Sequence, residues 1–386
     1  MKILDKSKLK KSIDEHVKKD IEEEYVGGAE IIVNQNGERV FHELYGKKNE
    51  NQDISPDCLY RIASMTKPVT ACAVLKEVER GNIDLDDDVS NYLPEFEYSN
   101  LDIAKVENYK QVIVGKNTKR LKVFHLLTHT SGIGSDWLFG KALAKMTDDD
   151  KKDLDCAVAY YSKEPLQFEP FTKECYSPTA SFDVAAKIVE KTSKKPFDVY
   201  LKENLFDPLG MKDTTFTPTK EQWDRVVGMF DRDKNGKGYF CEMPDGCVYE
   251  SFPAQCFCAG AGLVSGAEDY SKFAEMLSAL GKDKNGNQIL DGELIKNKMA
   301  TPLVPASLMS QNIHQWGLGV RVITNDKYIL PVGSFGWSGA WATAFWVDPV
   351  NKITAIYMKN IRCTRYGEYE EITKINFEKD VMDALK

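Results

Sequence analysis

The sequence has no long apolar run, and this absence limits where the protein can work. None of its 386 residues lies in a stretch approaching the ~20 apolar residues that a membrane-spanning helix needs. The N-terminus also lacks the apolar core and the small-residue cleavage site of a signal peptide. We therefore expect a cytoplasmic protein with no membrane partner.

Basic clusters are missing as well. The formal net charge is −8, and the lysines of residues 6–19 alternate with acidic residues, which is typical of a solvated helix face. A nucleic-acid partner would require a dominant basic patch. The sequence thus indicates a globular protein that does not bind nucleic acid, and nothing in it predicts an oligomeric state.

Regularly spaced cysteines and histidines are also absent. The nine cysteines are odd in number and scattered, which fits reduced thiols better than disulfides. Two cysteine pairs come nearest to a metal pattern: Cys256 with Cys258, and Cys241 with Cys247. No second pair follows at zinc-finger spacing, and the histidines lie elsewhere. We expect no metal and no cofactor.

One segment does match a metal motif formally. Asp231–Glu242 has the acidic spacing and the glycine of an EF-hand calcium loop. However, its flanks are not clear amphipathic helices, and Gly238 stands where an apolar residue normally packs. Asp, Asn and Gly also cluster this way in tight turns. We expect a hairpin turn here and keep calcium binding as the alternative.

The hydrophobic pattern divides the chain into strands and helices. An amphipathic helix is expected at 9–21, followed by strands at 29–34 and 39–45 that Asn36-Gly37 joins as a hairpin. Helices are expected through much of 123–206 and at both 273–280 and 372–385. Strands are expected in the last part of the chain, at 318–324, 328–332, 341–347 and 353–358.

This order predicts two interleaved domains. Residues 1–85 and 260–386 would form an α/β domain built from both termini. Residues 86–259 would form an inserted, mainly helical domain, with the active site at the interface between the two.

The chemistry begins at Ser64 and Lys67, at the start of an apolar helix that runs from 69 to 79. Residues three apart share a helix face, so the hydroxyl and the amine can meet. A serine hydroxyl needs a base to become a nucleophile, and a desolvated lysine can act as one. A lone Ser-x-x-Lys occurs by chance in most long proteins, so it indicates a catalytic site only if other motifs in the chain support it.

Four further motifs follow in order. They are Leu126-Leu127-Thr128-His129-Thr130-Ser131-Gly132, Tyr176-Ser177, Ala259-Gly260-Ala261-Gly262-Leu263-Val264-Ser265 and Gly336-Trp337-Ser338-Gly339-Ala340. Together with the segment from Asp207 to Met211, this order resembles the serine β-lactamase-related family, which contains class C β-lactamases, DD-peptidases and family VIII carboxylesterases. The resemblance implies an α/β (α+β) fold of the β-lactamase/transpeptidase type. In that fold an antiparallel sheet is flanked by helices and carries a mostly helical insertion.

The resemblance also implies roles for individual residues. Ser64 would be the acylated nucleophile, Lys67 its base partner, and Tyr176 the group that exchanges protons with nucleophile and leaving group. A phenol serves as a base only where a nearby cation stabilises the phenolate. The backbone N–H groups of Ser64 and Ala340 would form the oxyanion hole.

The third motif of the family, a Lys-Thr-Gly triplet, matches Trp337, Ser338 and Gly339. The resemblance places it on the edge strand of the sheet, where Gly339 would allow close approach of a substrate. Tryptophan offers apolar surface and a single donor, not the charge of the family's lysine.

A second departure lies beside Tyr176, where Pro178 replaces the asparagine of class C β-lactamases. Both departures point away from anionic β-lactams and towards neutral short-chain esters. Tyr176-Ser177 with the downstream Asp183 looks most like the family VIII esterases.

Other candidates are weighed as core residues. His125 and His129 lie on an apolar helix, and we interpret them as satisfied core histidines. Five aromatic residues are candidates for the pocket wall and equally for the core: Trp137, Phe139, Tyr249, Trp316 and Phe335.

The favoured hypothesis is therefore a hydrolase of small carboxylic esters. Three alternatives stay open at this point: a β-lactamase or D-aminopeptidase-like amidase acting on small amides, an acyltransferase on the same scaffold, and a non-catalytic binding scaffold.

Overall fold

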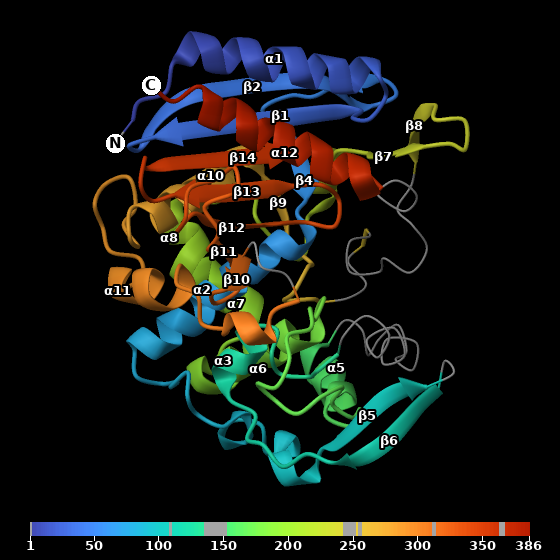
Figure 1. Ribbon diagram of the computed structural model, residues 1–386, viewed down its shortest axis with the longest axis vertical. Helices are drawn as coiled ribbons and strands as arrows, with labels where there is room; N and C mark the ends of the chain where they lie inside the picture. Colours follow the sequence, from blue (N-terminus) through green and yellow to red (C-terminus); the bar gives the residue numbers. More distant parts are fainter. Residues whose placement is uncertain are drawn as a thin grey trace.

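The computed structural model describes residues 2–107, 110–134, 153–241, 252–253, 257–310, 314–362 and 367–386, with side chains of the last segment from residue 372. Its centre is an antiparallel sheet of eight strands (Figure 1). The strands run in the order β10 (His314–Trp316), β11 (Arg321–Ile323), β12 (Phe335–Ser338), β13 (Ala344–Asp348), β14 (Ile353–Met358), β1 (Gly28–Gln35), β2 (Glu38–Asn49) and β3 (Gln52–Asp53). This sheet, made from both ends of the chain, confirms the predicted fold class.

The centre of the sheet is covered on both faces, which explains why every residue of β1 is buried. On one face, α1 (Lys6–Glu22) and α12 (Gly367–Asp383) pack together and enclose one apolar cluster. On the other face, α10 (Ala267–Ser278) packs against β1, β13 and β14. The N- and C-termini lie close together beside α1, as Figure 1 shows.

Below the sheet in Figure 1 lies a mainly helical region. Its helices include α3 (Val123–Leu127), α5 (Leu154–Tyr161), α6 (Ala180–Ser193) and α7 (Phe197–Leu201), whereas α8 (Asp207–Leu209) lies beside the sheet. The short helix α9 (Lys220–Asp224) follows α8 in the chain. The hairpin β5 (Asp102–Glu107)–β6 (Lys110–Lys116) projects from this region. The remaining short elements are β4 (Leu59–Arg61), β7 (Met229–Arg232), β8 (Gly238–Cys241), β9 (Val264–Gly266) and α11 (Gly292–Leu294). The division into domains at 85/86 and 259/260 stays a prediction.

Helix α2 (Thr66–Glu79) joins the two regions. It packs against α6, and eleven of its fourteen residues are buried, including Lys67 and Glu77. A helix that is apolar on nearly all sides needs neighbours all round. Its position between the sheet-based layer and the helical region supplies them.

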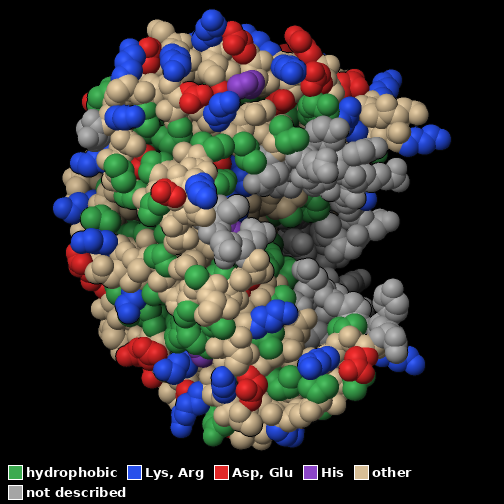
Figure 2. Space-filling view, in the orientation of Figure 1, with side chains coloured by type: hydrophobic (Ala, Val, Ile, Leu, Met, Phe, Trp, Pro, Cys, Tyr) green, Lys and Arg blue, Asp and Glu red, His purple; other side chains and the backbone are tan. Residues whose placement is uncertain are grey.

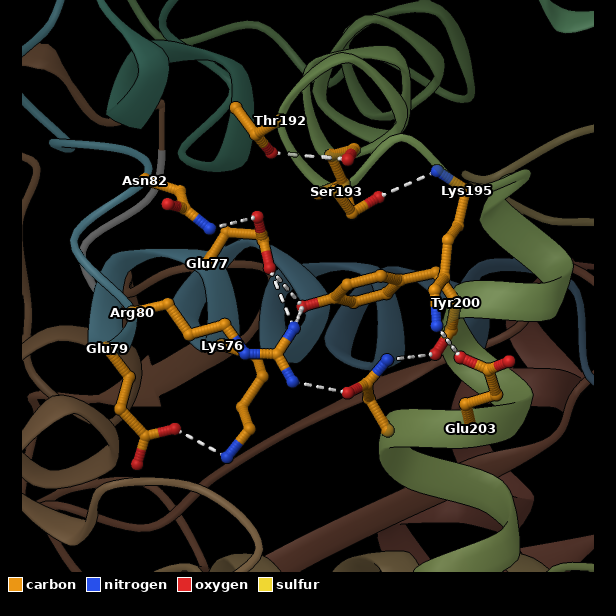
Figure 3. Close-up of polar contacts among 12 residues, drawn as sticks. Lys76, Glu77, Glu79, Arg80, Asn82, Thr192, Ser193, Lys195, Tyr200 and Glu203 are labelled. Atoms are coloured by element: carbon orange, nitrogen blue, oxygen red, sulfur yellow. Dashed lines mark hydrogen bonds and ion pairs between the residues drawn. The ribbon is translucent and has the colours of Figure 1, made fainter.

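The carboxyl end of α2 is held by a polar cluster, drawn in Figure 3. Fully buried Glu77 accepts hydrogen bonds from Tyr200 Oη at 2.8 Å, Arg80 Nη1 at 2.9 Å and Asn82 Nδ2 at 3.0 Å. Arg80 also donates to the side chain of Asn204. Burial alone would raise the pKa of Glu77, but hydrogen bonds led by the one from Tyr200 overcome it and lower that pKa.

Local predictions agree well with the structure at both ends of the chain. The residues Leu9, Ile13 and Val17 are buried on one face of α1, as their spacing predicts. Asn36 and Gly37 both have positive φ, at 54° and 76°, which is the conformation that an Asn-Gly hairpin turn adopts.

Two predictions about strands are wrong. Residues 328–332 form turns, because Tyr328 donates its backbone N–H to Asn325 and the chain folds back at Gly333. In addition, β12 is not the edge strand, since β11 and β10 continue the sheet beyond it. However, β11 pairs only with Phe335 and Gly336, so it does not cover the end of β12 that carries the third motif.

The metal-like segment forms the expected hairpin turn between β7 and β8. The carboxylate of Asp233 accepts the backbone N–H groups of Asn235 and Lys237, and Gly236 has a φ of 84°. Glu242 lies outside the described residues. Within the described ranges no group of three His, Cys, Asp or Glu side chains is arranged to hold a metal ion.

In the part of the chain that the structure describes, no helix combines the length and the apolar character that crossing a membrane would require. On the face drawn in Figure 2, basic and acidic side chains lie interspersed.

Candidate active site

Ser64 lies on a single 3₁₀ turn, η1 (Ala63–Met65), between β4 and α2. The turn begins at Ala63, whose φ of 43° is left-handed. Such a conformation costs a residue with a side chain about 1–3 kcal/mol. The strained turn places the half-buried Ser64 at the amino end of α2.

Lys67 lies one turn further along and is fully buried. Its Nζ donates to Ser64 Oγ at 3.2 Å, to the carbonyl oxygen of Gly260 at 2.9 Å and to the carbonyl oxygen of Pro178. An ammonium group has three donors. All three donors of Lys67 therefore have acceptors, and two of these acceptors are backbone carbonyls.

This arrangement gives Ser64 a special position among the three partners of Lys67. A neutral amine keeps two N–H donors and gains a lone pair. The two carbonyl oxygens can only accept, whereas the Ser64 hydroxyl can also donate. When Lys67 is neutral, its lone pair therefore faces Ser64, which is the geometry that a base requires.

Tyr176 completes the group. Its hydroxyl donates to Ser64 Oγ at 2.7 Å, and Lys67 Nζ lies 4.8 Å from the centre of its ring. The ring also contacts three aromatic side chains, with centroids at 4.5 Å for His129, 5.5 Å for Trp337 and 6.1 Å for Trp316. The structure thus brings Ser64, Lys67 and Tyr176 together within hydrogen-bonding distance.

The third motif lies at the end of β12, next to η1. A side chain at Gly339 would place its Cβ 2.4 Å from the carbonyl oxygen of Ile62, so only glycine fits this approach. Trp337 and Ser338 are half-buried, and Ala340 is exposed. The backbone N–H of Ala340 donates to no acceptor among the described residues, so it is available to a ligand.

Trp337 has a cation as a neighbour that sequence reasoning missed. The guanidinium carbon of Arg321, on β11, lies 5.7 Å from the centre of its ring. The Trp337 indole N–H is buried and has no hydrogen-bond partner among the described residues. The third-motif lysine of the family is thus replaced by an aromatic ring beside an arginine from the neighbouring strand.

The two histidines are buried, as predicted. Burial, reinforced by Lys122, lowers the pKa of His125 to about 3. Burial, and then the charge of Lys67, lowers the pKa of His129 well below 6.5. The Nδ1 atom of His129 accepts the N–H of Ser177 at 3.0 Å, but its Nε2 has no partner within the described ranges. The prediction that His129 is a fully satisfied core histidine is therefore wrong for this atom.

The pocket-wall candidates separate into three groups. Trp316 is buried against Tyr176, His129 and Trp337, so it supports the site from behind. Phe335 is part of the main apolar core. Trp137, Phe139 and Tyr249 lie outside the described residues, as do Cys247 and Cys256.

Sequence reasoning named Pro178 and Asp183 but missed the groups that they bind. The Pro178 carbonyl binds Lys67, although the residue was singled out only for a lost amide. Asp183 is buried, and its carboxylate accepts the N–H of Ala259 at 2.7 Å. Burial, opposed by this hydrogen bond and the one from Tyr161, raises the pKa of Asp183 to about 7. A carboxylate on a helix with apolar neighbours was the available signal.

Comparison with known proteins identifies the family of this chain. The Beta-lactamase family model matches residues 13–371. Esterase EstB of Burkholderia gladioli is 28% identical over 378 residues, covering 92% of each chain.

Solved structures share the fold. EstCE1, described as a hydrolase with promiscuous acyltransferase activity, superposes with a TM-score of 0.79 at 19% identity, covering 98% of this chain and 99% of its own. A mutant of simvastatin synthase from Aspergillus terreus gives a TM-score of 0.78 at 20% identity, covering 98% and 97%. Because the family match spans nearly the whole sequence, this chain belongs to the Beta-lactamase family of hydrolases.

Proposed function

We propose that the protein hydrolyses short-chain carboxylic esters through an acyl-enzyme on Ser64. The observation that carries the proposal is that Ser64 Oγ lies within hydrogen-bonding distance of both Lys67 Nζ and Tyr176 Oη. A hydroxyl flanked by two proton-exchanging groups is the arrangement that nucleophilic catalysis requires. The similarity to an esterase, EstB, supports the choice of substrate class.

In the acylation step, Ser64 Oγ bonds to the ester carbonyl carbon and its proton moves to Lys67 or Tyr176. The carbonyl oxygen becomes an oxyanion, which the N–H groups of Ser64 and Ala340 would stabilise. The C–O bond to the alcohol then breaks, and the leaving oxygen takes up the proton. Tyr176 is suited to deliver this proton, because its hydroxyl contacts Ser64 while its ring packs against aromatic side chains.

In the deacylation step, water adds to the carbonyl carbon of the acyl group on Ser64, and the pair of Lys67 and Tyr176 accepts the proton of this water. The bond to Ser64 Oγ breaks, Oγ regains a proton, and the carboxylic acid leaves. An alcohol in place of water would yield a new ester by the same route, so an acyltransferase would need no further residue. The ratio of the two products distinguishes these functions.

The acyl groups that we propose are small and neutral. Trp337 offers an indole surface where the family's lysine would bind a carboxylate. Pro178 has no amide for a peptide or β-lactam side chain, and its carbonyl is already used by Lys67. These features disfavour the amidase alternative, although Arg321 brings a positive charge near the motif.

The test compares p-nitrophenyl acetate and butyrate with nitrocefin, on the natural protein and on Ser64→Ala. We expect ester turnover, poor nitrocefin turnover, and loss of both in Ser64→Ala. A mass increase on Ser64 after treatment with a fluorophosphonate would identify the acylated residue. Preferred turnover of nitrocefin would contradict the esterase assignment, and full activity in Ser64→Ala would contradict the mechanism.

A further inference from the structure

Asp183 is a buried carboxylate for which the proposed reaction has no use. It lies in the first turn of α6 with 1% of its surface exposed. Its Oδ1 accepts the N–H of Ala259 at 2.7 Å and its Oδ2 accepts the hydroxyl of Tyr161 at 3.1 Å. The backbone of Gly260 also favours the charged carboxylate and helps to limit the rise of its pKa. These donors favour the ionised carboxylate and offset part of the effect of burial, which is the larger of the two.

The backbone that Asp183 holds is the same backbone that holds Lys67. Thr70 Oγ1 donates to the carbonyl oxygen of Ala259 at 2.7 Å, and Lys67 Nζ donates to that of Gly260 at 2.9 Å. The N–H of Ala259 thus points to the Asp183 carboxylate on α6. The carbonyl groups of the same segment point to the Thr70 hydroxyl and the Lys67 ammonium group on α2.

The segment packs closely against the start of α6. A Cβ at Gly260 would lie 2.7 Å from Thr179 Cα and 2.9 Å from the Pro178 carbonyl oxygen. This close approach is why glycine is required there, and it places two of the three acceptors of Lys67 in one packed unit. A change at Asp183 would therefore reach Lys67 through a single peptide segment.

The burial of the Lys67 cation also has to be explained. Lys67 is fully buried, and no ion pair among the described residues joins it to a carboxylate. An isolated buried cation is costly. Asp183 is a buried carboxylate on the far side of the Ala259–Gly260 segment, and its charge interacts with that of Lys67.

We propose that Asp183 is a positioning residue for the Ser64–Lys67 pair and provides the buried counter-charge of Lys67. The proposal rests on the proposed function, because it assigns a role within the same site. Asp183 acts through the Ala259–Gly260 segment and touches neither Ser64 nor the substrate position.

The surroundings of Asp183 contain few other charges. Lys67 faces it from α2 and Tyr161 from α5, while His129, which precedes the second motif, is neutral because of burial. Lys187, one turn further along α6, is engaged with Asp155 and Glu190. Because burial raises the pKa of Asp183 to about 7, its charge changes in the neutral range.

Replacement of Asp183 by asparagine separates charge from geometry. The amide oxygen of Asp183→Asn can still accept from Ala259, and its NH₂ group can face the Tyr161 oxygen, so the segment stays in place. The measurement is the rate at which a fluorophosphonate acylates Ser64, followed by intact mass between pH 5 and 10. Removal of a negative charge makes the positively charged state of a neighbouring site less favourable, so we expect the acid limb of this profile to move about one pH unit or more to lower pH.

Two other variants define the geometric part. Asp183→Ala removes both the charge and the support, so we expect the acid limb to move and the plateau rate to fall about 10²-fold, the cost of a misplaced catalytic group. Asp155→Asn removes an exposed carboxylate of α5 and should leave the profile unchanged. A merely structural role for Asp183 would lower the folded fraction without moving the acid limb.

A second measurement covers the case in which Asp183→Asn does not fold. In Lys67→Met, Asp183 ionises with no cation nearby, so the free energy of unfolding should fall more steeply between pH 6 and 9 than in the natural protein. Parallel stability curves, or an acid limb that Asp183→Asn leaves in place, would overturn the proposal. Absence of Ser64 acylation in the natural protein would overturn the proposed function itself, a result that no Asp183 variant can produce.

Discussion

The two ends of helix α2 are both buried and polar, yet they are built differently. At the carboxyl end, Glu77 is fully buried, and its carboxylate is surrounded by the donors of Tyr200, Arg80 and Asn82 (Figure 3). At the amino end, the equally buried Lys67 has two carbonyl oxygens and one hydroxyl as partners. No described ion pair neutralises it directly.

The neighbours of the amino end are also incompletely paired. His129 Nε2, Trp337 Nε1 and Thr179 Oγ1 are buried without hydrogen-bond partners among the described residues. Such groups cost about 1–3 kcal/mol each. We infer that the well-paired carboxyl end anchors α2 at Glu77. The amino end, where buried groups lack partners, can therefore hold the groups that are proposed to transfer protons.

Among the variants that test this comparison of the two ends of α2, Lys67→Met should have the largest effect. Loss of the base should lower ester turnover about 10²–10⁴-fold, the usual contribution of a general base. The free energy of unfolding at pH 5 should not decrease, because Asp183 is uncharged there and a buried cation is replaced by an apolar side chain of similar length. Steady-state kinetics at pH 8 and urea unfolding at pH 5 would test both parts. A marked loss of stability would show that Lys67 is structural.

Glu77→Leu should show the opposite behaviour. Removal of the carboxylate leaves the Tyr200 hydroxyl and the Asn82 amide without their acceptor, so we expect a loss of about 3 kcal/mol in the free energy of unfolding. Turnover per folded molecule should stay within about twofold, because the site is at the other end of the helix.

The matched control for this prediction is Glu79→Gln, two residues away. Glu79 pairs with Lys76 at 2.6 Å near the surface, and a pair of this kind contributes about 0–1 kcal/mol. If the two variants lost equal stability, the cluster around Glu77 would not be the anchor of α2.

Tyr200→Phe should have a smaller effect in the same direction. It removes one hydrogen bond to a charged acceptor, worth about 1.5–3 kcal/mol, and leaves the ring in place. Denaturant unfolding would measure the loss. In the double variant with Glu77→Leu, the two losses should not add, because both remove the same interaction. Additive losses would mean that the two side chains act independently.

The smallest expected effect is on the pH dependence of stability. As the pH rises, the contribution of Glu77 to stability should increase and that of Asp183 should decrease. The pKa of Glu77 is lowered from 4.5, so its contribution to stability is present above pH 4.5 and is lost as the pH falls below it. The pKa of Asp183 is raised from 3.8 to about 7, so its contribution is present below pH 3.8 and is lost as the pH rises towards 7.

Unfolding free energies measured from pH 3.5 to 8 would separate the two groups. Glu77→Gln should remove part of the rise of stability at the acid end of this range. Asp183→Asn should remove part of the fall between pH 4 and 7. A change of the same sign in both variants would contradict the difference that we infer between the two ends.

The sequence predicted well those features that depend on near neighbours in the chain. Ser64 and Lys67 meet because they are three residues apart at a helix start. The Asn36-Gly37 turn follows from the freedom of these two residues to adopt positive φ. The amphipathic α1 follows from the spacing of its apolar side chains. Order and type of the motifs were sufficient to predict the fold class.

Predictions failed where distant segments compete for the same backbone. The interval 328–332 has strand-like composition, but its donors are used in turns. The third motif was expected on an edge strand. The strand expected at 318–324 does form as β11, but its pairing with β12 and the additional strand β10 depend on tertiary contacts. The unpartnered Nε2 of His129 results from packing against Trp316 and Tyr176, which come from other parts of the chain.

By itself, the sequence determined the family, the candidate nucleophile and its two partners, because these depend on residue type and on spacing along one helix or one motif. The tertiary structure decided what surrounds Lys67. The carbonyl groups of Pro178 and Gly260 and the carboxylate of Asp183 come from two segments far from α2 in the chain, 178–183 and 259–260. Backbone carbonyls carry no residue signature, and a buried charge acquires its properties only from the groups that folding places around it.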